Sequence, residues 1–85
     1  MPADFRWNAW NADHATKHGC TIEEIESVVR RGIRQAVRGG NDKWSIEGRG
    51  QGGRVVRVVF LYDGDGTIFV IHAMPLTTRR RRGRR

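Results

Sequence analysis

The chain has 85 residues, of which 38% are hydrophobic and 29% are charged. A chain this short can enclose one hydrophobic core, which predicts a single domain over residues 1–78 and a separate basic tail over residues 79–85. The lone Cys20 excludes an internal disulfide, and no apolar run approaches the roughly 20 residues of a membrane span. We therefore expect a cytoplasmic protein without a membrane partner.

The net charge of +7 is unevenly distributed along the chain. Six of the sixteen Lys and Arg residues lie in the last seven positions, and the other ten face nine acidic residues. The tail has no apolar residue, so we expect it to be disordered until it meets an anion. Arg79, Arg80, Arg81 and Arg82 are therefore candidate RNA-binding residues, and a solvated terminus that aids solubility is the alternative.

The N-terminal part of the domain predicts an extended arm and one short helix. Phe5 and Trp7 alternate with polar neighbours, which is typical of a strand or an extended arm. The polar stretch over residues 8–17 suits a short helix that ends at Gly19.

A second helix is predicted by its start and stop signals. Thr21 and Glu24 have the spacing of a capping box, and Cys20 and Ile25 have that of a hydrophobic staple. The helix should begin at residue 22 and run for about ten residues, until Gly32 ends it in a left-handed cap.

The remainder of the domain predicts strands. Period-two alternation over residues 33–38 and 43–47 indicates two half-buried strands around a turn at 39–42. Two apolar runs at 55–62 and 67–74, joined by a tight turn at 63–66, indicate two central strands. We expect an α+β domain in which two N-terminal helices pack on a mainly antiparallel, twisted sheet of about four to five strands. One face of the sheet should be at least partly open.

Several short segments, taken in order, resemble one known family. They are Phe5-Arg6-Trp7-Asn8, Lys17-His18-Gly19, Lys43 to Arg49, Gly53-Arg54 and Ile71-His72-Ala73. Over residues 5–78 their order and spacing are similar to those of the BrnT family of toxins. The resemblance implies a RelE-like fold, an endoribonuclease that stops translation, and a ribbon-helix-helix antitoxin of the BrnA type that neutralises the toxin and joins it on operator DNA.

The chain also departs from the family pattern at four positions. Asn8, Trp10, His14 and Met74 stand where the family has an acidic residue, Lys, Asn and Arg, respectively. These departures leave open a weakened toxin, or a non-catalytic RNA- or DNA-binding module in which the same basic residues only position phosphates. A third alternative is an interaction protein whose tail and exposed sheet bind an acidic partner by charge and strand addition.

RNA cleavage without a metal or other cofactor needs a base, an acid and fixed positive charge. Lys17 and His18 meet this description because they lie just before the N-terminus of the second helix. In the alternative, Lys17 is solvated and His18 is a hydrogen-bonded residue at a helix end.

The glycine-rich connection over residues 49–53 supplies further candidates. If the strands pair across four residues, Arg49 and Arg54 lie opposite one another, which favours a bound phosphate. If the register slips by one at a bulge, both are ordinary hairpin residues. Glu47 is a candidate general base or an ion-pair partner, and Arg57 joins Arg54 among the expected RNA-binding residues.

His72 completes the candidate catalytic set. It follows Ile68 and Val70 at strand spacing, so we expect all three side chains on one face, with His72 either a core histidine or an acid or base. We assign Trp7 and Trp44 to the core and leave Trp10 open between packing and base stacking. We expect no metal site, although His14, His18 and Cys20 are potential ligands.

Overall fold

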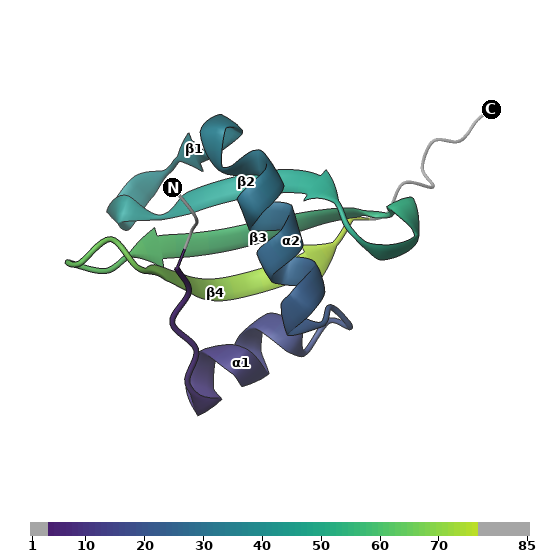
Figure 1. Ribbon diagram of the computed structural model, residues 1–85, viewed down its shortest axis with the longest axis horizontal. Coiled ribbons are helices and arrows are strands. Elements are labelled where there is room, and N and C mark those ends of the chain that lie inside the picture. Colours follow the sequence, from purple (N-terminus) through teal and green to yellow (C-terminus); the bar gives the residue numbers. More distant parts are fainter. Residues whose placement is uncertain (1–3, 77–85) are drawn as a thin grey trace.

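The computed structural model describes residues 4–76, which form the α+β fold that the sequence predicts (Figure 1). The elements are the helices α1 (Ala9–Thr16) and α2 (Ile22–Gly32), the 3₁₀ turn η1 (Ile33–Gln35), and the strands β1 (Val37–Arg38), β2 (Trp44–Arg49), β3 (Val55–Tyr62) and β4 (Ile68–Pro75). The strands pair antiparallel in the order β1-β2-β3-β4. The N-terminal arm is extended, as expected, and Phe5 forms a parallel bridge with Ile68.

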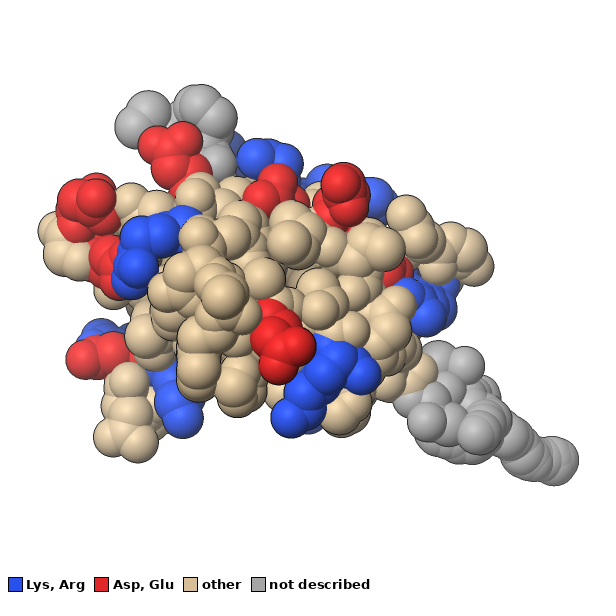
Figure 2. Space-filling view, turned by 90° about the horizontal axis from the view of Figure 1, so that it is seen from below, with Lys and Arg blue, Asp and Glu red and all other residues tan. Residues whose placement is uncertain are grey.

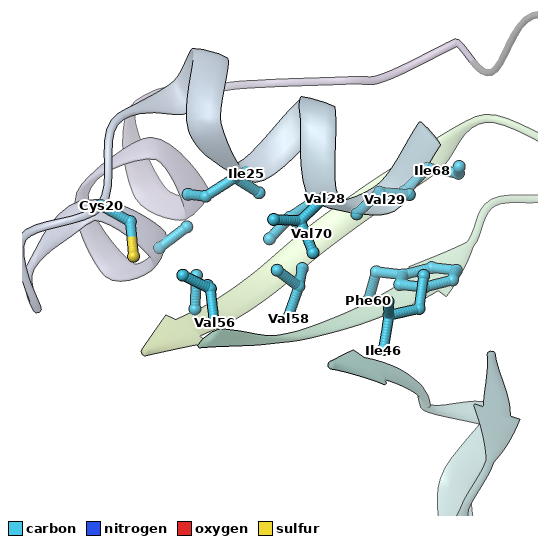
Figure 3. Packing of buried hydrophobic residues seen from close by; sticks show 12 residues of the cluster. Cys20, Ile25, Val28, Val29, Ile46, Val56, Val58, Phe60, Ile68 and Val70 are labelled. Carbon is cyan, nitrogen blue, oxygen red and sulfur yellow. The ribbon is translucent and has the colours of Figure 1, made fainter. Parts of the chain in front are cut away.

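The core lies between α2 and one face of the sheet (Figure 3). Ile25, Val28 and Val29 of α2 pack here against alternate residues of β3 and β4, such as Val58 and Val70. Because side chains alternate along a strand, the intervening residues point to the other side of the sheet. Neither helix of the described part covers that side (Figure 1), which we call the open face. Its residues are Ser45, Glu47, Arg49, Val55, Arg57, Val59, Leu61, Phe69, His72 and Met74.

The short helix α1 lies beside β4 and is fixed by a buried asparagine (Figure 1). Asn8 and Asn11 form a reciprocal capping box, in which each side-chain oxygen accepts from the other residue's backbone N–H. The Nδ2 group of Asn11 also donates to the carbonyls of Arg6 and Val70, both at 3.0 Å. One side of α1 is therefore tied to the sheet, and the side that bears Trp10 is left exposed.

Helix α2 has the predicted bounds, but its ends differ from the prediction. Thr21 caps it by accepting from the Glu24 N–H at 3.1 Å, whereas the Glu24 carboxylate binds Arg54, so the expected capping box is only half formed. Gly32 has φ −114°, so the predicted left-handed cap is wrong. A Cβ at Gly32 would lie 2.8 Å from Ile46 Cγ2, which indicates that close packing, rather than backbone conformation, requires this glycine.

The strand predicted over residues 33–38 is mostly absent. Because no left-handed residue reverses the chain at the end of α2, residues 33–35 tighten into η1. Ile33 packs against the core from this turn, which explains its apolar character without a strand. Only Val37 and Arg38 remain to pair with β2, and β1 is correspondingly short.

Candidate nucleic-acid interface

His72 lies on the open face, not on the core face that the sequence predicts. Val59 pairs with His72 and Phe60 pairs with Val70, so Ile71 is an extra residue that forms a β-bulge. The extra residue reverses the alternation, and His72 no longer shares the face of Val70. The ring is half-buried and lies outside the core. The interpretation of His72 as a core histidine is therefore wrong, and the bulge explains why.

The bulge brings His72 next to His18, at the end of α1. The centroids of the two imidazole rings lie 5.3 Å apart at an interplanar angle of 66°. His18 comes from the connection between α1 and α2, and it reaches β4 because α1 lies along that edge of the sheet. We call this pair the histidine cluster. The structure thus brings together two candidates that are 54 positions apart in the sequence.

The surroundings of His72 favour its neutral form. Partial burial lowers the pKa of His72 below its ordinary value of 6.5, and the nearby positive charges of His18, Lys17 and Arg57 lower it further. A neutral imidazole near pH 7 can accept a proton, as a general base must. Three residues that the sequence singled out, Lys17, His18 and Arg57, therefore all lower the pKa of His72.

Glu47 and Arg57 lie beside the histidine cluster and pair with each other. They are directly opposite on β2 and β3, and Arg57 Nη2 donates to Glu47 Oε2 at 2.8 Å. This confirms the ion-pair interpretation of Glu47. Both side chains are about half exposed, so the pair contributes little stability and can exchange for an anionic ligand.

Arg49 and Arg54 do not face one another. Arg49 pairs with Val55, so the predicted opposition of two like charges is wrong and the register is the one displaced by one residue. Arg49 donates to the Gly53 carbonyl. It lies on β2 four residues beyond Ser45, which is level with His72 across the sheet. Its distance along the strands is about 13 Å, which separates it from the histidine cluster.

Arg54 forms a structural ion pair, and part of its side chain is exposed. Its Nη2 and Nε donate to the two oxygens of Glu24 at 2.7 and 3.0 Å, and Nη2 also donates to the Gly19 carbonyl at 3.1 Å. The Glu24 side chain is 0% exposed and that of Arg54 is 40% exposed. Arg54 therefore links α2 to the connection that carries His18.

Glu24 is the residue that the sequence reasoning missed. Its carboxylate also accepts from the Gln51 N–H at 2.8 Å, and a Cβ at Gly50 would overlap it. The hydrogen bond from Arg54 chiefly lowers the pKa of Glu24, against the opposing effect of burial. A glutamate in the first turn of a helix is common because its charge interacts favourably with the helix dipole. The sequence position of Glu24 therefore does not indicate that it pairs with Arg54.

The aromatic assignments are confirmed where they were made. Trp44 packs at the border of the core, and Trp7 does the same while its indole N–H donates to Glu26 at 2.8 Å. Trp10 is 52% exposed and stacks on His14.

Cys20 is buried, and burial raises the pKa of its thiol. Within residues 4–76, His, Cys, Asp and Glu side chains form no cluster of three that would suit a metal ion.

Two further predictions concern the basic tail and the absence of a membrane span. The candidate RNA-binding residues Arg79, Arg80, Arg81 and Arg82 lie outside the described residues. None of the helices within residues 4–76 has the length and apolar composition that a membrane span requires. No protein-family model, curated protein or solved structure matches the chain.

Proposed function

We propose that this protein is a metal-independent endoribonuclease and the toxin of a bacterial type II toxin–antitoxin pair. The observation that carries the proposal is the histidine cluster, where two imidazole rings meet on an open sheet face with Lys17 and Arg57 nearby. An acid, a base and fixed positive charge are the groups that RNA cleavage by side chains needs. The resemblance to the BrnT family supports the same reaction.

The proposed reaction uses the two histidines as base and acid. His72, neutral near pH 7, accepts the proton of a ribose 2′-hydroxyl, and the oxygen attacks the adjacent phosphorus. The bond from phosphorus to the 5′-oxygen breaks, and His18 donates a proton to that leaving oxygen. The products are a 2′,3′-cyclic phosphate and a 5′-hydroxyl end.

Lys17 and Arg57 are the proposed phosphate ligands in this scheme. Arg57 lies two residues from Val59, the strand partner of His72, on the same face of the sheet. Lys17 directly precedes His18 in the chain. A phosphodiester held at the histidine cluster therefore lies near both positive charges. Arg57 exchanges its exposed bond with Glu47 for a bond to the phosphate, because exposed ion pairs are weak. Positive charge fixed there stabilises the extra negative charge of the pentacoordinate transition state.

The partner and the setting of the proposed toxin come from the family resemblance. We propose a ribbon-helix-helix antitoxin of the BrnA type that neutralises the enzyme, binding of the complex to operator DNA, and inhibition of translation in the cytoplasm. Growth arrest on expression of the chain alone, relieved by such an antitoxin, is the result that this part of the proposal requires.

We expect purified protein to cleave an end-labelled RNA in the presence of EDTA. Mapping of the new ends should give cyclic phosphates, because the 2′-hydroxyl is the nucleophile. The same RNA with 2′-O-methyl groups should stay intact, since it lacks that nucleophile, and serves as the control.

Two results would contradict the proposal in different ways. Intact RNA that the protein still binds would identify a non-catalytic nucleic-acid-binding module, in which the same cations only hold phosphates. Cleavage that EDTA abolishes would show that the histidine cluster does not perform the reaction without metal.

A further inference from the structure

Three aromatic rings, of which Trp10 is exposed and the other two are partly buried, form a stack near the histidine cluster. The ring of Trp10 stacks on that of His14, with centroids 4.1 Å apart. It is also nearly parallel to the ring of Phe69, at 6° and a centroid distance of 6.1 Å. We call Trp10, His14 and Phe69 the stacking surface.

The exposure of this surface is not explained by core packing. Trp10 is 52% exposed, whereas the buried side of α1 is formed by Asn11 and Ala15. Seen from the side of α1 (Figure 2), most of the face is uncharged, an acidic and a basic side chain adjoin near its middle, and other charged side chains lie toward its rim. A flat aromatic ring in such a setting suits a partner that is itself flat and unsaturated.

An arginine lies at one end of the stacking surface. The Arg6 guanidinium lies over the Phe69 ring, 4.5 Å from its centroid. It is exposed and shares its charge with Asp63, whose Oδ2 is 2.6 Å from Arg6 Nε. Rings combined with an arginine are what proteins use to bind the bases and the backbone of single-stranded nucleic acid together.

The position of the stacking surface links it to the histidine cluster. Trp10, His14 and His18 are spaced by four residues, so they follow one side of α1 and its last turn. The Nδ1 atom of His14 lies 2.9 Å from the Trp10 carbonyl, and this contact holds the His14 ring in place. From Trp10 to His18 the rise is about 12 Å, the length of a few stacked nucleotides.

We propose that the stacking surface binds unpaired bases next to the phosphate held at the histidine cluster. The substrate is then single-stranded RNA, since the bases of a duplex are stacked on each other and present no free ring face. This inference rests on the proposed function, because it places the stacked bases on the same strand as the cleaved phosphate.

The test compares two uncleavable single-stranded oligonucleotides by fluorescence anisotropy. One is a 2′-O-methyl RNA, and the other has the same backbone but abasic sites in place of its bases. The variants are Trp10→Ala, the conservative Trp10→Phe, and Tyr62→Ala as a matched control. Tyr62 is an exposed aromatic residue on the opposite face of the sheet from Phe69, where it contacts Trp44. Circular dichroism checks that each variant is folded.

We expect Trp10→Ala to weaken binding of the base-containing strand at least about fivefold, the lower end of what one lost base stack costs. Binding of the abasic strand should not change, Trp10→Phe should restore most of the affinity, and Tyr62→Ala should bind as wild type. Equal effects of Trp10→Ala on both strands, or none on either, would overturn the inference.

Failure of the inference and failure of the proposed function give different results. If the wild-type protein cleaves RNA but Trp10→Ala binds the base-containing strand normally, only base stacking is refuted. If Trp10 is needed for binding but no RNA is cleaved, the stacking surface stands and the endoribonuclease does not.

Discussion

His72→Ala is expected to lower kcat/KM for RNA cleavage at least about 100-fold near neutral pH, the usual effect of losing a general base. The ring lies on the open face beside His18, where a bulge in β4 places it. Arg49→Ala is the matched control, because Arg49 is a candidate on the same sheet that the structure separates from the cluster. Single-turnover rates would measure both variants.

The pH dependence of the reaction gives this prediction a second readout. His72 must be neutral to accept a proton, and its pKa is lowered below 6.5 by burial and by the charges of His18, Lys17 and Arg57. The rising limb of kcat/KM against pH should therefore lie below pH 6.5. Lys17→Gln removes one opposing charge and should move the rise to higher pH, whereas Arg34→Gln, on η1, should not.

Either of two outcomes would remove His72 from the role of general base. The first is a His72→Ala variant that cleaves like wild type. The second is a pH profile whose rise stays at the same pH in Lys17→Gln, because the charge of Lys17 would then not act on the titrating group. Folding of each variant is checked by its thermal unfolding midpoint.

Glu24→Gln is expected to lower the free energy of unfolding by about 2 kcal/mol, as loss of charged hydrogen bonds does in protein interiors. The Glu24 carboxylate is fully buried and accepts from Arg54 and from the Gln51 N–H. Glutamine keeps the shape but removes the charge and places an amide N–H₂ against a donor. In a domain of this size the midpoint should fall by about 10 °C. Glu23→Gln, the exposed neighbour in the same first turn, is the control.

The same pair predicts how stability depends on pH. The pKa of Glu24 is lowered in the folded state from the ordinary value of 4.5, so its charged form stabilises the fold. This contribution is present above pH 4.5 and is lost as the pH falls below 4.5 through the folded-state pKa. Urea titrations across that range should show a smaller loss for Glu24→Gln than for wild type. Equal stability of the two proteins near neutral pH would contradict the assigned role.

The sequence predicted those parts of the fold that depend on local signals. Thr21 marks the start of α2 because a threonine side chain caps a helix through its own backbone neighbours. The runs at 55–62 and 67–74 predict β3 and β4 because they are rich in β-branched and aromatic residues, which are favoured in strands. The strand predicted over residues 33–35 was wrong, since Gly32 does not adopt the left-handed conformation and these residues form η1.

The candidate site was predicted in its residue types but not in its arrangement. His18, Lys17, Glu47 and His72 were all chosen from the sequence, and the structure brings the first two near His72. The bulge at Ile71 decides the face of His72, and a period-two pattern cannot reveal one extra residue. The ion pair of Arg54 was not predicted, because its partner Glu24 is 30 positions away and no local spacing links them.

Chemical-shift mapping of the isotope-labelled protein with an uncleavable 2′-O-methyl RNA is the most direct test of the interface. The largest changes should fall on amides of the open face and its edge, including Lys17, His18, Val59 and His72. The groove between α2 and the loop after β2, lined by Ser27 and Gln51, should change little. Changes concentrated in that groove, with none around the histidine cluster, would contradict the assignment of the open face as the RNA-binding surface.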